Sequence, residues 1–275
     1  MLDRRLPGVG RIIGARFQRL ERQVVRSADA VIVITQDFVP VLRAWGVPEE
    51  RMAVIENWAP LDEIKPLPKA NDWAIGHGLD TSFVFLYAGT LGRKHDPSLL
   101  VTLADAVAPA RVVVASEGFG TDRLAAGRRP ENLQLLPLQR PEELAGMLAS
   151  ADVLVAILEK DAGEYSVPSK ILTYLAAGRP ILAAIPRSNL AARTIMDAQA
   201  GLLVDPADHA ALADAALRLV KDPQQRSIAG RAARSYAEHA FDITVIAERF
   251  EAVLESAVQL AHSHRAPRAD TLQNP

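Results

Sequence analysis

The chain has 275 residues, of which 49% are hydrophobic and 23% charged, a composition that allows a globular core without disulfide or metal support. Its 31 basic and 33 acidic residues nearly cancel, which argues against a nucleic-acid-binding protein, because such a domain is strongly basic. The lack of cysteine excludes disulfides, thiolate metal sites and cysteine nucleophiles. No apolar run approaches the roughly 20 residues of a membrane span, and no secretory signal is visible, so a cytoplasmic protein is expected.

The first 56 residues predict a short α/β segment. An arginine-rich helix is expected over residues 11–27, with four apolar residues at helical spacing: Ile13, Phe17, Leu20 and Val24. A fully buried strand, a helix and a second strand are expected next, over residues 30–34, 36–45 and 51–56. Two strands are too few to make a sheet of their own, so this segment is interpreted as part of a larger domain.

Residues 57–82 are interpreted as a linker, because prolines and glycines interrupt them. From residue 83 onward, short apolar runs alternate with helical patterns, which predicts right-handed βαβ crossovers and a Rossmann-like, doubly wound parallel sheet over residues 83–242. The expected strands are residues 83–88, 111–115, 133–136, 152–157, 180–184 and 201–204. The expected helices are residues 97–107, 121–128, 141–149, 169–177, 189–197 and 207–221. Asp222 and Pro223 predict the start of a further helix, followed by a separate helix over 243–262 and a disordered tail over 263–275.

Four loops are expected at the carboxyl ends of the strands, where such sheets bind ligands. Residues 88–94 join two glycines to two cations, a combination suited to phosphate, and His95 beside them is expected to be a solvated loop residue. Residues 161–170 lead into a helix start with Lys170 beside it, which suits an anion. The loops at 116–120 and 136–139 allow close approach of a ligand to the backbone. Each loop also has a simpler interpretation as a strand-to-helix connection with solvated charges.

Three segments carry a family resemblance: YAGTLGRK (87–94), LLPLQRPEELAGMLASADVLVAIL (135–158) and SVPSKILTYLAAGRPI (166–181). They resemble the nucleotide-sugar-binding domain of GT-B glycosyltransferases of family 4, in the branch of bacterial polysaccharide and O-antigen assembly. The resemblance implies the C-terminal half of a GT-B fold, with residues 1–56 as a remnant of an N-terminal acceptor domain that is otherwise absent. It implies transfer of a hexose from a nucleoside-diphosphate donor, expected to be a UDP-sugar, to a glycan or lipid-linked acceptor in cell-surface polysaccharide or lipopolysaccharide synthesis.

The same resemblance implies a donor-binding site. Gly118 of the second loop would belong to this site, and the backbone at Leu138 would frame the nucleobase. The sugar and phosphates would be bordered by Ser166, Val167, Ser169 and Lys170. The donor diphosphate would be held by Gly89, Gly92, Arg93 and Lys94. Family members often carry two glutamates eight residues apart around the third loop, and here those positions hold Tyr165 and Thr173. Glu164 is therefore the candidate for the ribose-binding carboxylate. Thr173, at the position of the second glutamate, is also counted as a donor-binding residue.

The resemblance also implies which groups the reaction needs. Arginine, lysine and a helix N-terminus would neutralise the departing diphosphate, so no metal or other cofactor is predicted. The catalytic side chain is expected in the absent N-terminal domain and is unknown. The expected partners are the nucleotide-sugar, the acceptor, a companion acceptor-domain subunit and, through residues 11–27, the inner face of a membrane, but no nucleic acid.

Three alternatives stay open at this point. A non-catalytic or split-enzyme nucleotide-sugar-binding subunit would share the same sheet. A nucleotide-sugar epimerase would need an acid/base set that the sequence does not reveal. An NAD-dependent dehydrogenase is disfavoured, because the first strand is not followed by G-x-G-x-x-G.

Overall fold

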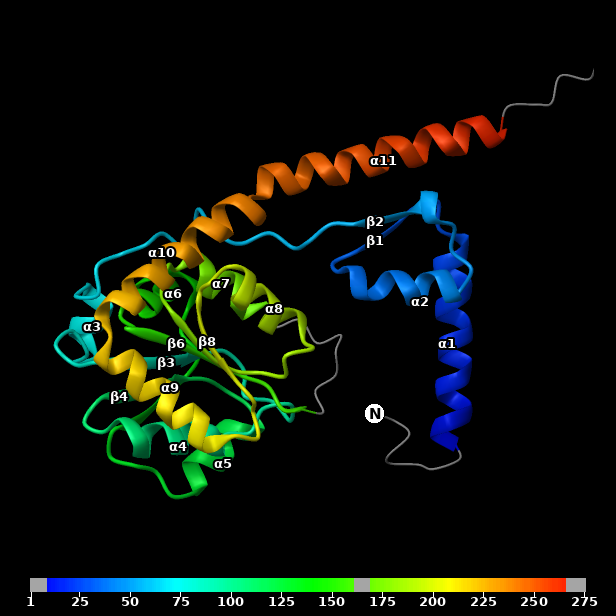
Figure 1. Cartoon of the computed structure of the whole chain (residues 1–275). Coiled ribbons are helices and arrows are strands. Elements are labelled where there is room, and N and C mark those ends of the chain that lie inside the picture. Colours follow the sequence, from blue (N-terminus) through cyan, green and yellow to red (C-terminus); the bar gives the residue numbers. More distant parts are fainter. Residues whose placement is uncertain (1–8, 161–168, 266–275) are drawn as a thin grey trace, which may run out of the picture. The chain divides into compact units, whose positions relative to one another are not determined.

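The computed structural model describes residues 9–160 and 169–265, which divide into two compact units (Figure 1). The larger unit spans Trp58–Ile243, and the smaller one combines Met1–Asn57 with Thr244–Pro275. None of the described helices has both the length and the apolar character of a membrane span.

The larger unit is built on a six-stranded, wholly parallel sheet in the order β5-β4-β3-β6-β7-β8. The chain runs outward from β3 to β5, returns to the other side of β3 at β6, and continues outward to β8, so the connection direction switches between β3 and β6. The predicted doubly wound α/β sheet is therefore confirmed. The strands are β3 Val84–Ala88, β4 Arg111–Ala115, β5 Leu133–Leu136, β6 Val153–Ile157, β7 Ile181–Ala184 and β8 Gly201–Val204.

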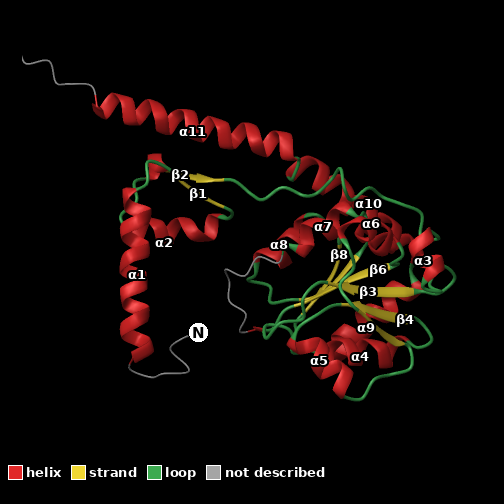
Figure 2. Ribbon diagram, turned by 180° about the vertical axis from the view of Figure 1, so that it is seen from behind, coloured by secondary structure: helices red, strands yellow, loops and turns green. Residues whose placement is uncertain are grey.

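Helices cover both faces of this sheet (Figure 2), which explains why its central strands are continuous apolar runs. One buried cluster lies between the sheet and helices α6, α7, α8 and α10, and the other lies under α4 and α9. Asp222 accepts a hydrogen bond from the Gln225 N–H and Pro223 follows it, as the sequence predicted for the start of α10. The helices are α4 Ser98–Val107, α5 Phe119–Ala126, α6 Pro141–Ala149, α7 Lys170–Ala176, α8 Leu190–Asp197, α9 His209–Lys221 and α10 Pro223–Ala240.

The segment predicted as a linker contains a short helix, α3 Asp72–Gly76, that the sequence analysis did not predict. The segment belongs to the same compact unit as the sheet, and its side chains Ile64, Trp73 and Leu79 are buried in the core. Asn71 caps α3, since its side-chain oxygen accepts from the N–H groups of Trp73 and Ala74. Five residues are too few to show a helical period, so the capping residue Asn71 was the sequence signal from which this helix could have been predicted.

The smaller unit holds two strands, β1 Val31–Val33 and β2 Met52–Val54, which pair with each other in parallel. They form a two-stranded sheet, so the expectation that two strands are too few for a sheet of their own is wrong. The expectation of a fully buried strand at 30–34 is wrong: β1 is half-buried, because in the described part of the chain it pairs with β2 alone. The final helix continues to Arg265, and the rest of the predicted tail lies outside the described residues. The other elements are α1 Val9–Ser27, η2 Gln36–Phe38, α2 Val39–Ala44, η3 Glu49–Arg51 and α11 Ile243–Arg265.

Candidate functional site

A pocket of about 540 Å³ opens at the carboxyl edge of the six-stranded sheet. It lies where β3, β4 and β6 end, beside the point at which the connection direction reverses, the usual ligand position in such sheets. Its walls come from the loop after β3, the segment between β5 and α6, α6 itself, and the start of α7. The lining residues are Ala88, Gly89, Thr90, Lys94, His95, Ala115, Leu138, Gln139, Leu144, Met147, Leu148, Leu158, Ser169, Lys170, Thr173 and Tyr174.

Lys170, the first residue of α7, is held at this pocket by an aromatic side chain of β3. Its Nζ donates to the Tyr87 hydroxyl at 2.6 Å and lies 3.8 Å from the centre of that ring. The Tyr87 hydroxyl in turn donates to the Thr90 carbonyl at 3.0 Å. Gly89 has φ +117°, and a Cβ there would lie 3.3 Å from Lys170 Nζ, so glycine both permits the turn and leaves room for the ammonium.

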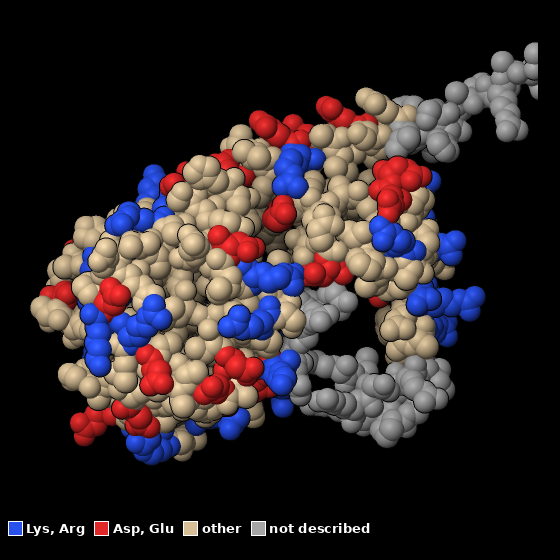
Figure 3. Space-filling model, in the orientation of Figure 1, with Lys and Arg blue, Asp and Glu red and all other residues tan. Residues whose placement is uncertain are grey.

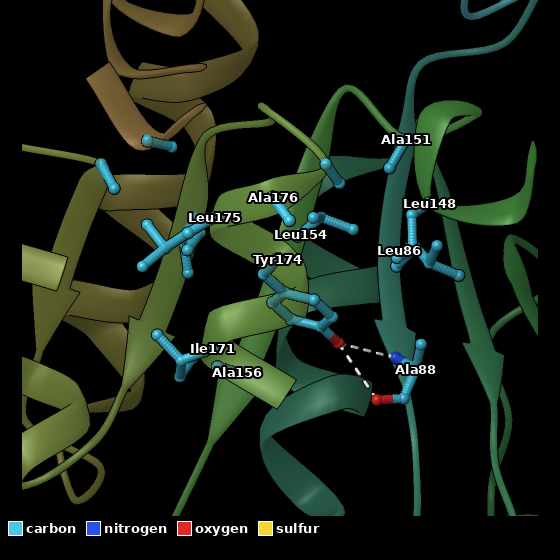
Figure 4. Close-up of a cluster of buried hydrophobic side chains, with 14 of the residues drawn as sticks. Leu86, Ala88, Leu148, Ala151, Leu154, Ala156, Ile171, Tyr174, Leu175 and Ala176 are labelled. Atoms are coloured by element: carbon cyan, nitrogen blue, oxygen red, sulfur yellow. Dashed lines mark hydrogen bonds between the residues drawn. The ribbon is translucent and has the colours of Figure 1, made fainter. Parts of the chain in front are cut away.

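Tyr174, one helical turn after Lys170, anchors α7 to Ala88 at the end of β3 (Figure 4). The buried Tyr174 hydroxyl accepts from the Ala88 N–H at 2.9 Å and donates to the Ala88 carbonyl at 3.2 Å. Burial raises the pKa of this phenol, so it remains a neutral donor and acceptor. Residues four apart share one helix face, so this anchor at the end of β3 also directs Lys170 toward the loop that follows β3.

Two basic groups of the pocket have unusual protonation equilibria. Burial lowers the pKa of Lys170 to about 7, so its amino group is only partly protonated near neutral pH. Burial and the charge of Lys170 lower the pKa of His95 to about 4. Because the Gly92 N–H donates to His95 Nδ1 at 3.1 Å, the neutral imidazole carries its proton on Nε2. An anion in this pocket would favour protonated Lys170, because an opposite charge stabilises the ammonium.

The structure brings about half of the predicted donor-site residues to this one pocket: Gly89, Lys94, Leu138, Ser169, Lys170 and Thr173. Gly92 lies next to it, through its hydrogen bond to His95. Glu164, Ser166 and Val167 lie outside the described residues. No group of three or more acidic or histidine side chains in the described ranges is arranged to hold a metal ion.

Two predicted residues lie elsewhere. The Arg93 guanidinium stacks over the Phe119 ring, 4.8 Å from its centre, and does not line the pocket. Gly118, with φ +103°, serves close packing, because a Cβ there would lie 3.2 Å from the Leu91 carbonyl oxygen. The diphosphate role of Arg93 therefore stays a prediction, and Lys94 and Lys170 are the two cations of the pocket lining.

Three lining residues were missed or misjudged in the sequence. Tyr174 was not singled out, and Gln139 was included only as part of the loop at 136–139. His95 was expected to be solvated but is half-buried in the lining. The signal for Tyr174 was available, since it follows Lys170 at the spacing of one helical turn.

Comparison with known proteins places this sheet and pocket in a family. Residues 82–222, more than half of the chain, match the family model described as glycosyl transferases group 1. The chain belongs to the group 1 glycosyl transferases. Residues 2–58 of this group 1 glycosyl transferase match a second model, described as a glycosyl transferase 4-like domain.

Two curated relatives carry names of the same kind. WcaI of Escherichia coli, named as a colanic acid biosynthesis glycosyl transferase, is 25% identical over 190 residues, which are 65% of this chain and 46% of the relative. WbjE of Pseudomonas aeruginosa, named as a glycosyltransferase, is 26% identical over 215 residues, which are 72% of this chain and 51% of the relative. The chain thus spans about half the length of the curated relatives it matches.

Solved structures share the fold of this group 1 glycosyl transferase. Sucrose-phosphate synthase of Thermosynechococcus elongatus superposes with a TM-score of 0.69 at 21% identity, covering 89% of this chain and 61% of its own. HepE of Anabaena, solved with UDP, superposes with a TM-score of 0.72 at 18% identity, covering 86% of this chain and 67% of its own. The α/β sheet is thus that of GT-B glycosyltransferases, while assignment to family 4 and the absence of an N-terminal half stay predictions.

Proposed function

We propose that this group 1 glycosyl transferase binds a nucleoside-diphosphate sugar in the pocket at the carboxyl edge of its sheet. The observation that carries the proposal is the convergence of Lys94, Lys170 and the positive-φ Gly89 on one cavity. Fixed cations beside accessible backbone suit a diphosphate. The structurally similar HepE was solved with UDP and with UDP-glucose, which supports UDP as the carrier.

The chemistry follows from the charge that develops when the bond between the anomeric carbon of the sugar and the diphosphate oxygen breaks. The departing nucleoside diphosphate gains negative charge, and a group that is already positive and placed beside it stabilises the transition state more than the ground state. Lys170 suits this role, because Tyr87 and the Tyr174 anchor hold its ammonium at the pocket. With two lysines to neutralise the diphosphate, we expect transfer without a metal or other cofactor.

The substrate and pathway extend this proposal. We expect a UDP-hexose as donor and a glycan or lipid-linked acceptor in cell-surface polysaccharide synthesis, in keeping with the relative named for colanic acid biosynthesis. Titration calorimetry with UDP and with UDP-glucose tests the donor site directly, and binding at micromolar to low millimolar concentration is expected. If no nucleoside diphosphate binds at millimolar concentration, the proposed function is wrong.

Donor binding is expected to weaken as the pH rises above 7. The pKa of Lys170 is about 7 in the free protein, and a bound diphosphate would raise it, so binding above pH 7 must take up a proton. The dissociation constant of UDP should therefore rise by up to about tenfold per pH unit above 7, until the pKa of the complex is reached. Calorimetry at about pH 8, in buffers of different ionisation enthalpy, should show uptake of nearly one proton. In the free protein His95, with a pKa of about 4, is neutral throughout this range.

The matched comparison for this pH dependence is the Lys170→Met variant. Without the lysine, proton uptake at about pH 8 should vanish and the dissociation constant should be nearly flat above pH 7. If the variant retains the proton uptake of the wild type, a group other than Lys170 titrates on binding.

A second candidate function is a nucleotide-sugar-binding subunit that needs a companion carrying the acceptor domain. The observation that favours it is the smaller unit, where large apolar side chains are exposed on α1 and α11 beside a two-stranded sheet. They are Ile13, Phe17, Leu20 and Val24 on α1, and Phe250, Leu254 and Val258 on α11. A companion would cover these faces and supply the unknown catalytic side chain. Transfer of sugar by this chain alone would contradict this candidate.

Membrane contact through residues 11–27 is a further part of the proposal. The apolar stripe of α1 is accompanied by basic side chains, which lie along this helix at the right of Figure 3. Anionic lipid suits such a combination, and a lipid-linked acceptor would be presented there, at the cytoplasmic face. Sedimentation with phosphatidylglycerol vesicles, but not with phosphatidylcholine vesicles, is the expected result, and Phe17→Ser should reduce it.

A further inference from the structure

The segment that follows β5, together with α6, lines the pocket differently from the lysine-bearing segments. The loop before α6 contributes Leu138 and the amide of Gln139, and α6 contributes the apolar side chains of Leu144, Met147 and Leu148. A nucleoside diphosphate has the same division, with a charged diphosphate and a flat base that carries hydrogen-bonding groups along its edge. If the diphosphate contacts Lys94 and Lys170, the base is left for the apolar segment, where Gln139 is the side chain able to hydrogen-bond to it.

The orientation of the Gln139 amide is dictated by two neighbours. Its oxygen accepts from the Trp73 indole N–H at 3.2 Å, and its nitrogen donates to the Pro137 carbonyl at 2.9 Å. An indole N–H can only donate and a carbonyl can only accept, so reversing the amide would break both hydrogen bonds. Beyond these two bonds, the Gln139 amide keeps one N–H and one oxygen lone pair in a fixed arrangement, and the residue lines the pocket.

Trp73, in turn, is held rigidly from outside the pocket. It is buried on α3, and its ring stacks on His77, with ring centres 3.9 Å apart and planes 20° apart. Asn71 joins α3 to α6 by donating to the Gly146 carbonyl at 3.0 Å. A Cβ at Gly146 would lie 3.2 Å from the Trp73 Cβ, so the glycine permits this close approach. A short helix far from the lysines in the sequence thus fixes one polar group of the pocket.

We propose that Gln139 is a specificity-determining residue that contacts the nucleobase of the donor, and that Trp73 is the positioning residue that fixes its amide. The inference rests on the proposed function, because it requires a nucleotide in the pocket. It goes beyond that function by assigning base discrimination to one side chain and to a helix that the binding pocket does not include.

The experiment compares nucleotides with a probe that has no base. The wild type, Gln139→Met, Trp73→Phe and the double variant are titrated with UDP, dTDP, GDP and ADP, and with inorganic pyrophosphate. Trp58→Phe, which makes the same change at an exposed tryptophan outside the pocket lining, is the control. Thermal unfolding of each variant is recorded, and Gln139→Met keeps the test valid if Trp73→Phe fails to fold.

Each single variant is expected to lose about 5- to 10-fold in affinity for the preferred nucleotide, as removal of one neutral hydrogen bond predicts, with pyrophosphate affinity unchanged. The double variant should lose no more than Gln139→Met, because Trp73 acts through Gln139. Unchanged nucleotide affinity in Gln139→Met, or an equal loss for pyrophosphate, would overturn the inference. Normal affinity in Trp73→Phe would overturn the positioning role. If the wild type binds pyrophosphate but discriminates no base, the inference fails while the diphosphate site stands, and if it binds nothing, the proposed function itself fails.

Discussion

Replacing Lys170 with methionine is expected to weaken UDP binding about 10- to 100-fold, the usual effect of losing one hydrogen bond from a charged group. Lys170 is the cation that the structure positions most firmly, with its Nζ on the Tyr87 hydroxyl and its helix anchored to Ala88 through Tyr174. Methionine keeps the length and the packing against the Tyr87 ring while removing the charge. Calorimetry at about pH 6.5, where Lys170 is mostly protonated, gives the cleanest comparison.

Two further variants give this prediction its controls. Lys221→Met makes the same chemical change on an exposed side chain at the end of α9 and should leave UDP affinity unchanged. Arg93→Met should weaken binding less than Lys170→Met, because the Arg93 guanidinium stacks on Phe119 rather than lining the pocket. Wild-type affinity in Lys170→Met would show that the pocket is not the diphosphate site. A larger loss in Arg93→Met would show that the diphosphate lies toward Phe119 instead.

The centre of the sheet could be predicted closely from the sequence because its strands are buried on both sides. Such strands are continuous apolar runs between turn residues, as in β4, where the expected bounds of 111–115 agree with the structure, and β6, expected over 152–157 and observed at Val153–Ile157. The same argument failed for β1, which has the apolar run but not the neighbours that would bury it. Hydrophobic pattern predicts that a strand forms, but its burial depends on what pairs with it.

The candidate site was predictable only from short motifs within single loops and from the place of those loops in the sheet. Gly89 and Lys170 were selected because loops at the carboxyl ends of parallel strands meet at one edge. The contacts that define the pocket join distant residues, such as Tyr87 with Lys170 and Trp73 with Gln139, and these depend on packing between elements. Arg93 and Lys94 are neighbours in the chain, yet only Lys94 lines the pocket, because sequence does not fix side-chain direction in a loop.

Substitution of Gly201 by alanine is expected to destabilise the protein by about 3 kcal/mol or more, at the upper end of overpacking effects. Gly201 is the first residue of β8 and pairs with Ile181 of β7. The side of its Cα that would carry a side chain lies against the backbone of β7. A Cβ there would lie 1.9 Å from the Ile181 carbonyl oxygen and 2.7 Å from the Ile181 nitrogen. Backbone atoms cannot move aside as a flexible side chain can, so β8 would have to separate from β7.

The matched control is Gly76→Ala, in which a Cβ at the end of α3 would meet no atom within 4 Å. That variant should retain wild-type stability or gain a few tenths of a kcal/mol, because alanine is the better helix former. Urea unfolding followed by circular dichroism measures both. Because β8 is an edge strand that contributes no residue to the pocket lining, Gly201→Ala should lower the urea midpoint while leaving UDP affinity under native conditions nearly unchanged. Equal stability of the two alanine variants would show that β7 and β8 do not pair in the register described.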